Sequence, residues 1–161
     1  MDDATAHVTA CGLAKLFDHM TCAHEKHGAL RYDKRSRRVG ERNTKILIVE
    51  DDTPSAEAIS ALLELEGFVV RRASDALEAM DSARTFTPDV VLVDLQLPFI
   101  DGRSFIELYR RGVHPAASII VMSGREDASR VASSLRADAF VAKPFDVADL
   151  LRAISLTLSA A

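Results

Sequence analysis

The sequence contains no apolar run long enough to cross a membrane. No run approaches the roughly 18 residues that such a segment requires, and the mean hydropathy is close to zero. The N-terminus, Met1-Asp2-Asp3-Ala4-Thr5, is acidic, whereas an export signal begins with basic residues and continues with apolar ones. We therefore expect no membrane contact and a cytoplasmic location.

The sequence also has few cysteines and only a small net charge. Cys11 and Cys22 are the only cysteines, and without an export signal two reduced thiols are favoured over a disulfide. The net charge of −4 is mild but unevenly distributed. Residues 1–44 hold eight Lys/Arg and six Asp/Glu, which gives +2, and residues 45–161 hold the remaining twelve and eighteen, which gives −6. We therefore predict an N-terminal extension, residues 1–44, and a larger domain, residues 45–161.

The N-terminal extension has one apolar face that predicts an amphipathic helix, followed by the basic run Lys34-Arg35-Ser36-Arg37-Arg38, which predicts a solvated linker. A nucleic-acid contact is not expected, because this single short cluster lacks interleaved aromatic residues. Several cysteines and histidines could bind a metal, but their spacing matches no zinc signature. The apolar face comprises Val8, Cys11, Leu13, Leu16, Phe17 and Met20, and the metal donors are Cys11, His19, Cys22, His24 and His27.

From Lys45 onward, short apolar runs alternate with segments of helical periodicity. Five strands alternating with five helices favour βαβ units, and hence an α/β fold with a doubly wound, flavodoxin-like, five-stranded parallel sheet. Thr53 is expected to cap the first helix, with Pro54 at its first helical position. The predicted strands are 46–49, 68–70, 90–94, 119–122 and 139–142, and the predicted helices are 53–66, from 74 or 75 to 83, 101–112, 126–135 and from 146 onward.

Asp94 is the most informative residue of this pattern, because it ends the buried apolar run Val90-Val91-Leu92-Val93. Burial of an unpartnered polar group costs about 2–7 kcal/mol, and an unpaired charge costs more. In open α/β sheets, ligands bind just beyond the carboxyl ends of the strands. Asp94 is therefore expected at the strand's exit, where it faces a cation, a phosphoryl donor or both.

Other polar residues follow the neighbouring strands and are expected at the same edge of the sheet. They are Glu50, Asp51 and Asp52 after the first strand, Ser123 after the fourth, and Lys143 after the fifth. Crowded carboxylates repel one another unless a cation intervenes, and hard oxygen ligands select Mg²⁺ or Mn²⁺. A lysine and a hydroxyl could bind the oxygens of a phosphoryl group, and transfer of that group to a carboxylate is an established form of covalent chemistry.

Four motifs now become informative together: Ile46-Leu47-Ile48-Val49-Glu50-Asp51-Asp52, Val93-Asp94-Leu95-Gln96-Leu97-Pro98, Val121-Met122-Ser123-Gly124 and Ala142-Lys143-Pro144-Phe145. In order and spacing they resemble the signatures of the response-regulator receiver domain of two-component signalling. The resemblance covers residues 45–158 and is to stand-alone, chemotaxis-regulator-like receivers.

The resemblance implies a role for each matching residue. Asp94 would accept a phosphoryl group from a histidine kinase or a histidine phosphotransfer protein. Glu50 and Asp51 would organise Mg²⁺, with Asp51 as the direct ligand, and the backbone carbonyl of Gln96 would be a further ligand. Lys143 would pair with the phosphoryl group. Ser123 and Phe140 would be the switch residues that couple the site to the outer surface.

The resemblance also implies a cis peptide bond before Pro144, and it assigns Gln96 and Arg125 to positions that set the dephosphorylation rate. Two residues depart from the family's common pattern. Phe99 stands where the family often has glycine, which reduces loop flexibility and adds an exposed apolar group. Phe140 lacks the hydroxyl that tyrosine would bring there, so its inward state gains packing without a hydrogen bond.

Three other interpretations were weighed. A dinucleotide-binding domain needs a Gly-rich loop after the first strand, where acidic residues stand instead. A phosphatase with an aspartate nucleophile, of the haloacid-dehalogenase type, needs a second aspartate two residues after Asp94, and Gln96 occupies that position. A receiver fold used as an unphosphorylated docking module remains as the alternative, although no key position is lost.

We therefore expect a single-domain response regulator that is not an enzyme beyond its own phosphorylation and dephosphorylation. Only Ser159-Ala160-Ala161 follow the last predicted helix, so its output is expected to be altered binding of a downstream protein. The expected binding surface is formed by the helix at 126–135, the strand at 139–142 and the last helix. The sequence does not specify the kinase, the target, or whether the phosphorylated form becomes a homodimer.

Overall fold

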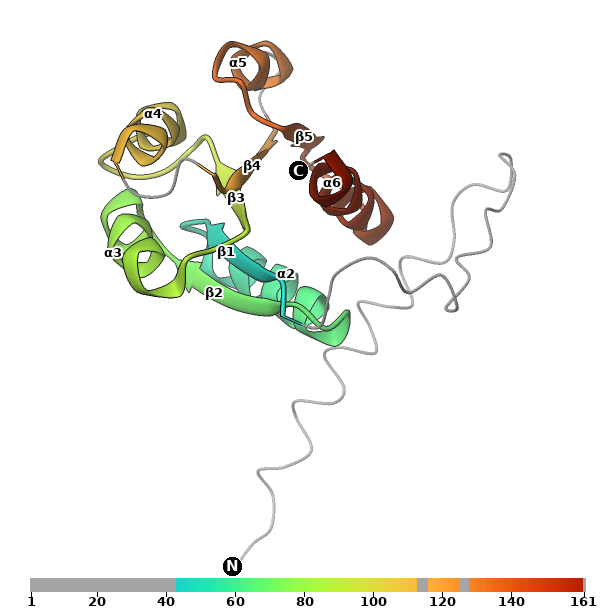
Figure 1. Ribbon diagram of the computed structural model, residues 1–161. Helices are drawn as coiled ribbons and strands as arrows, with labels where there is room; N and C mark the ends of the chain where they lie inside the picture. Colours follow the sequence, from blue (N-terminus) through green and yellow to red (C-terminus); the bar gives the residue numbers. More distant parts are fainter. Residues whose placement is uncertain (1–42, 113–115, 125–127, 161) are drawn as a thin grey trace, which may run out of the picture. The chain divides into compact units, whose positions relative to one another are not determined.

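The computed structural model describes residues 43–112, 116–124 and 128–160, and these form a five-stranded parallel sheet flanked by helices (Figure 1). The strand order is β2-β1-β3-β4-β5, and every neighbouring pair is parallel. The predicted α/β class with a doubly wound parallel sheet is confirmed. The elements are β1 Lys45–Val49, α2 Thr53–Leu65, β2 Val69–Ala73, α3 Ala76–Phe86, β3 Val90–Asp94, α4 Gly102–Gly112, β4 Ser118–Ser123, α5 Ala128–Ser134, β5 Ala139–Ala142 and α6 Val147–Ala160.

Helices cover both faces of the sheet. On one face, Ile59 and Leu63 of α2 and Leu150 and Ile154 of α6 pack against alternate residues of β1, β3 and β4. On the other face, α3, α4 and α5 pack against the intervening residues. Figure 1 shows α2 and α6 separated by the sheet from α3 and α4. Because both faces are covered, the central strands are apolar without alternation, as expected for a buried parallel sheet.

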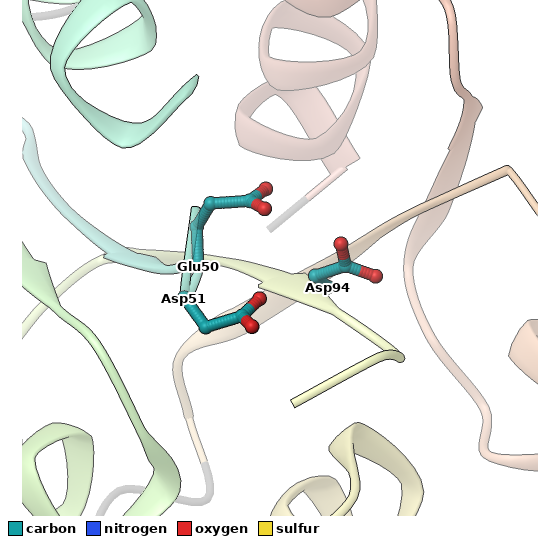
Figure 2. Close-up of side chains that lie close together, drawn as sticks. All are labelled: Glu50, Asp51 and Asp94. Atoms are coloured by element: carbon teal, nitrogen blue, oxygen red, sulfur yellow. The ribbon is translucent and has the colours of Figure 1, made fainter. Parts of the chain in front are cut away.

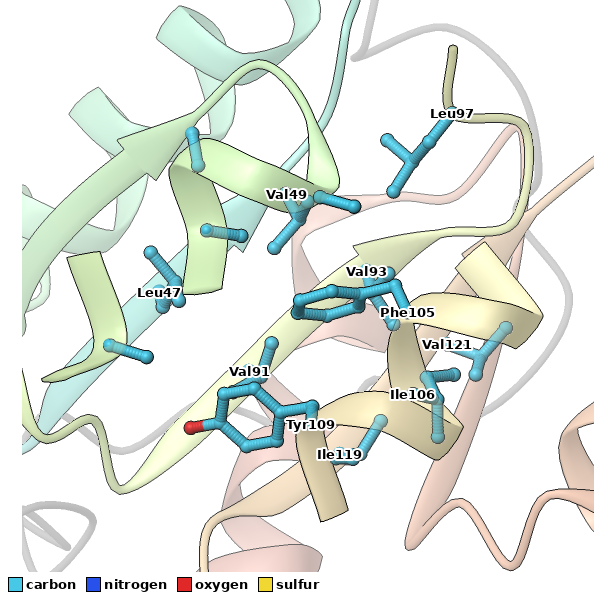
Figure 3. Close-up of a cluster of buried hydrophobic side chains, with 14 of the residues drawn as sticks. Leu47, Val49, Val91, Val93, Leu97, Phe105, Ile106, Tyr109, Ile119 and Val121 are labelled. Carbon is cyan, nitrogen blue, oxygen red and sulfur yellow. The ribbon is translucent and has the colours of Figure 1, made fainter. Parts of the chain in front are cut away.

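The largest side chains of the second face come from α4. Phe105 and Tyr109 have no exposed surface, and their ring centroids lie 5.5 Å apart in a tilted arrangement. Figure 3 shows them lying over β3, beside Val91 and Val93. Such aromatic pairs add about 0.5–1.5 kcal/mol to the free energy gained by burial. This packing fixes α4, and with it the loop that connects β3 to α4.

The observed boundaries differ from the predicted ones in several places; α3, for example, continues to Phe86, three residues beyond its predicted end. Thr53 is not the cap of α2: Asp52 is, because its carboxylate accepts a hydrogen bond from the Ser55 N–H at 2.9 Å. Strand β2 continues through Arg71 and Arg72 to Ala73, since it is an edge strand whose charged side chains reach solvent. Helix α5 is described over Ala128–Ser134 and ends one residue before the predicted end at Leu135.

Some predictions fall on parts of the chain outside the described residues. They concern the N-terminal extension up to residue 42, with its helix, basic linker and metal donors, and also Arg125. The boundary between the extension and the domain stays a prediction. Among the described residues, no helix combines the length and hydropathy that a membrane crossing requires.

Gly102, at the start of α4, lies directly against the backbone of the Asp94 strand end. A β-carbon at this position would lie 2.3 Å from the Asp94 carbonyl oxygen and 2.7 Å from the Leu95 Cα atom. The Gly102 N–H also donates to the Leu95 carbonyl at 3.1 Å. Both ends of the β3–α4 loop are therefore held at the same point, and only glycine allows this approach.

Gly102→Ala is expected to destabilise the protein by about 2 kcal/mol, because backbone atoms must move to admit the methyl group. The matched control is Gly112→Ala at the end of the same helix, where a β-carbon would meet no atom within 4 Å. Alanine there should leave stability unchanged or raise it by up to about 1 kcal/mol. Urea unfolding followed by circular dichroism measures both, and equal stabilities of the two variants would contradict the close approach.

Candidate functional site

The candidate site lies at the carboxyl edge of the sheet. Asp94 is the last residue of β3, Ser123 is the last residue of β4, and Glu50 and Lys143 directly follow β1 and β5. The parallel arrangement brings these positions to one edge, although Glu50 and Lys143 are 93 residues apart in sequence. The predicted grouping of polar residues at strand ends is therefore observed.

Lys143 connects two buried carboxylates. Its ammonium group donates hydrogen bonds to Asp94 Oδ2 at 2.6 Å and to Glu50 Oε2 at 2.5 Å. The side chains of Asp94 and Glu50 are only 6% and 2% exposed, whereas that of Lys143 is 25% exposed. Each buried carboxylate thus has a cationic partner, and the lysine remains reachable from solvent.

The pKa values of this cluster reflect a competition between burial and ion pairing. Burial raises the pKa of Glu50, and the neighbouring Asp94 and Asp51 add to this effect, while Lys143 opposes it. Burial alone would lower the pKa of Lys143, but its hydrogen bonds to Asp94 and Glu50 raise the pKa above its ordinary value. Lys143 therefore stays protonated at neutral pH, and its ammonium group can donate a charge-assisted hydrogen bond to an anionic ligand.

Three carboxylates are close enough to share one metal ion. Ligand oxygens of Glu50, Asp51 and Asp94 all lie within 4.8 Å of one another. Figure 2 shows these three side chains grouped at the strand ends. Asp51 is exposed, whereas the other two are buried. The donor set consists of hard oxygen atoms, which fit Mg²⁺ or Mn²⁺ and do not fit a zinc site rich in nitrogen and sulfur. These residues could hold a divalent cation.

The second oxygen of Asp94 orients the β3–α4 loop. Asp94 Oδ1 accepts a hydrogen bond from the Gln96 N–H at 2.9 Å, and the Gln96 side chain is exposed. Oδ1 is therefore tied to its own loop, while Oδ2 is tied to Lys143. The carboxylate is fixed in one orientation before any ligand binds, and such preorganisation favours chemistry at a defined atom.

Of the two predicted switch residues, Ser123 lies at the same strand-end edge as this cluster, and Phe140 lies three residues before Lys143 in β5. Ser123 is 1% exposed, and the backbone N–H of Lys143 donates to the Ser123 carbonyl at 3.0 Å. Phe140 in β5 is half-buried and packs against the core on the α3–α5 side of the sheet. The peptide bond between Lys143 and Pro144 is cis, as the resemblance implied. The structure thus brings the predicted strand-end residues to one edge of the sheet, whereas Phe140 lies within β5 against the core. Arg125 lies outside the described residues.

Sequence reasoning missed two features of the site. Its assignment of Lys143 to a phosphoryl group stays a prediction, but it did not foresee that the ammonium group is shared by Asp94 and Glu50. It also did not identify Gly102 as the residue that lets α4 approach Asp94. The dipeptide Asp101-Gly102 indicated a turn, but a close contact with a distant backbone atom leaves no local signal in the sequence.

Lys143→Met is expected to destabilise the metal-free protein by about 3 kcal/mol at neutral pH, because two buried carboxylates lose their cationic partner. The loss should grow from pH 5 to pH 8. Without Lys143, the folded-state pKa of Glu50 rises further above its ordinary value. A carboxyl group with a raised folded-state pKa costs no stability while it is protonated at low pH, and it lowers the free energy of unfolding as the pH rises toward that pKa.

Urea unfolding in EDTA at several pH values tests this expectation. The control is Lys45→Met, a lysine at the opposite edge of the sheet whose ammonium group makes only a 3.4 Å hydrogen bond to the Thr87 hydroxyl and a cation–π contact with Phe86. A loss for Lys143→Met no larger than for this control, or one independent of pH, would be evidence against the charge cluster.

Comparisons with known proteins agree with this geometry. Residues 46–155 match the family model of the response regulator receiver domain. The chain is 38% identical to the transcriptional regulatory protein CseB of Streptomyces coelicolor over 117 residues, which cover 71% of this chain and 49% of that protein. The chain therefore spans about half the length of the curated relatives it matches.

Solved structures show the same fold. The CheY-like response regulator receiver domain protein of Methanospirillum hungatei is 29% identical, with a TM-score of 0.67 over 73% of this chain and 94% of that one. The receiver domain of the sensor histidine kinase PA1611 of Pseudomonas aeruginosa, solved with a magnesium ion in its active-site cleft, is 27% identical, with a TM-score of 0.66 over 73% and 98% of the two chains. Since the family model covers more than half of the sequence, this chain belongs to the response regulator receiver domain family.

Proposed function

We propose that the chain is a magnesium-dependent phosphorylation switch in which Asp94 accepts a phosphoryl group from a histidine kinase or a histidine phosphotransfer protein. The observation that carries this proposal is the fixed Asp94 carboxylate, with Lys143 at 2.6 Å and the Glu50 and Asp51 carboxylates within 4.8 Å. In the transfer, the P–N bond of the phosphohistidine breaks, a P–O bond to Asp94 forms, and the histidine keeps the electron pair of the broken bond.

Each neighbouring residue has a defined task in this transfer. Glu50, Asp51 and Asp94 would hold Mg²⁺, together with the backbone carbonyl of Gln96, and the ion would offset the charge that gathers on the phosphoryl oxygens. Lys143 already lies on Asp94 Oδ2, so a small movement lets its ammonium group bind a phosphoryl oxygen. Ser123 would donate its hydroxyl to another. Gln96 and Arg125 would set how readily water reaches the phosphoryl group.

The site supports an acceptor more than a phosphatase. A phosphatase of the aspartate-nucleophile type needs an acid two residues after the nucleophile. Here Gln96 occupies that position, and an amide cannot supply a proton in this role. The family is generally not a family of catalytic enzymes, and we propose that this chain acts only on its own phosphorylation state.

Signal output would be a change in partner binding at the surface of α5, β5 and α6. Ser123 ends β4, and Phe140 is half-buried in the adjacent edge strand β5. Inward movement of Ser123 toward the phosphoryl group would make room for Phe140 to pack more deeply. The described part of helix α5, Ala128–Ser134, carries mostly small side chains, so it packs with little apolar surface. It is therefore a suitable moving part, because switching elements come from the less stable regions of a fold. This surface would bind the downstream protein, or a second phosphorylated copy.

Incubation with Mg²⁺ and acetyl phosphate should add one phosphoryl group to the wild-type chain, and Asp94→Asn should abolish the addition. Intact-mass spectrometry followed by peptide mapping measures both. Glu50 and Asp51 are the nearest alternative acceptors, so mapping must place the group on Asp94. An unmodified wild type would favour a docking module that works without phosphorylation, and turnover of a free phosphomonoester would favour a phosphatase.

Asp51→Asn should weaken Mg²⁺ binding by roughly tenfold or more, because the site loses a charged ligand. Asp52→Asn is the matched control: Asp52 is also exposed and adjacent, but it caps α2, and asparagine caps helices equally well. Calorimetric titration gives both dissociation constants, and Mg²⁺ should raise the melting temperature of the control as much as that of the wild type. Equal weakening in both variants would show a general charge effect without a direct Asp51 ligand.

A further inference from the structure

Phe99, in the β3–α4 loop, has an unusual conformation and an unusual exposure. Its φ angle is +64°, in the left-handed region that L-residues with a β-carbon rarely adopt. Its side chain is 97% exposed, so no burial offsets the strained backbone. Strained residues of this kind cluster at functional sites, where their geometry serves a contact or a reaction.

Leu77 of α3 extends the exposed apolar surface around Phe99. It is 65% exposed, and it lines one shallow hollow together with Pro98, Phe99 and Ile100. Two elements that are separated in sequence therefore present one apolar area to solvent. We call Leu77, Pro98, Phe99 and Ile100 the Phe99 patch.

The Phe99 patch borders the Asp94 site. The Gly102 N–H bonds to the Leu95 carbonyl, and Gly102 lies against the Asp94 backbone. Because Phe99 is three residues before Gly102, its Cα atom lies within about 11 Å of that contact. On the α3 side, the chain enters the helix just after Ala73, whose carbonyl accepts from the Glu50 N–H at 3.1 Å. Both sides of the patch are thus fixed close to the carboxylate cluster.

We propose that the Phe99 patch is a docking surface for the protein that donates the phosphoryl group, meaning a protein that carries it on a histidine. The inference rests on the proposed function. The phosphorus atom must reach bonding distance of Asp94 as its P–N bond breaks and the P–O bond forms. A protein that contacts Asp94 in this way buries about 800 Å² on each partner, which corresponds to a disc of about 16 Å radius. The patch falls inside that disc.

An exposed aromatic ring inside such a contact is well suited to be its anchor. Aromatic side chains bury large areas with little loss of conformational freedom, and they are enriched among the residues that dominate protein interfaces. A small phosphodonor, in contrast, reaches Asp94 without covering Phe99. The patch therefore speeds phosphoryl transfer from a protein donor and has no effect on transfer from acetyl phosphate.

The test compares the two donors on the same variants. Phe99→Gly removes the ring and suits the left-handed backbone, so the variant should fold at least as well as the wild type. Phe99→Asn tolerates the same backbone while keeping a β-carbon, which controls for loop flexibility. Leu77→Ala trims the second side of the patch. Its matched control is Leu65→Ala on α2, since Leu65 is also exposed, at 83%, and lies at the far end of a helix that begins at the carboxyl edge.

The histidine kinases of the source organism are first purified, autophosphorylated and compared for transfer to the wild-type chain. The kinase that transfers fastest is the protein donor in this test. Phe99→Gly, Phe99→Asn and Leu77→Ala should lower kcat/KM for this transfer by about tenfold, mainly through KM, as expected for lost binding. Leu65→Ala should not change it. With acetyl phosphate and Mg²⁺, all four variants should be labelled within about twofold of the wild-type rate.

Four results would overturn the docking inference. Equal losses with both donors would show that Phe99 acts on the chemical step, and unchanged transfer from the kinase would show that the patch is not covered. If the variants instead abolish self-association of the wild type in sedimentation, the patch belongs to an interface between two copies. Failure of acetyl phosphate labelling in the wild type would contradict Asp94 as a phosphoryl acceptor, and with it the proposed function. Labelling by acetyl phosphate without transfer from any kinase would leave Asp94 as an acceptor but contradict the docking inference and the kinase as donor.

Discussion

The ion pairs of Lys143 with Asp94 and Glu50 are the interaction on which the arrangement of the site depends. They join the ends of three strands through two contacts of 2.6 Å and 2.5 Å. Removing two carboxylates from water is costly, and such buried pairs often stabilise a fold no more than apolar residues of the same size would. The protein therefore retains these charges at an energetic cost, which is a reason to assign them to chemistry more than to stability.

The fold supplies what this charge cluster needs. β1 and β3 are adjacent in the centre of the sheet, so Glu50 and Asp94 meet at its carboxyl edge, and both faces of these strands are sealed by helices. The apolar surroundings exclude water and strengthen electrostatic interactions. Gly102 then fixes the β3–α4 loop against Asp94. The same contact that positions the loop for the carboxylate also holds Phe99 beside it.

The periodicity of the sequence was sufficient to predict the class of fold and the positions of the polar strand ends, because the apolar runs of a covered parallel sheet are distinctive. The ends of the helices and strands were harder to predict. Asp52 and Thr53 are both good helix caps, and only the observed bond from Ser55 N–H to the Asp52 carboxylate decides between them. Leu77 and Phe99 meet only through tertiary structure, so no local pattern could have paired them. The roles of the site residues remain predictions from the family resemblance.

The two ends of β3 show how position gives one residue type different roles. At the amino end, Asp89 accepts from the Lys45 N–H at 2.8 Å through its carboxylate, and its backbone bonds to Lys45 and Ser118, so it joins three strands. Its side chain is at the surface, where the charge remains hydrated. At the carboxyl end, Asp94 is buried between other charged groups. Asp89 is bound by backbone donors at the surface and has a structural role. Asp94 Oδ2, in contrast, is bound by a partly exposed lysine beside two further carboxylates, so this oxygen is placed to exchange its partner for a ligand.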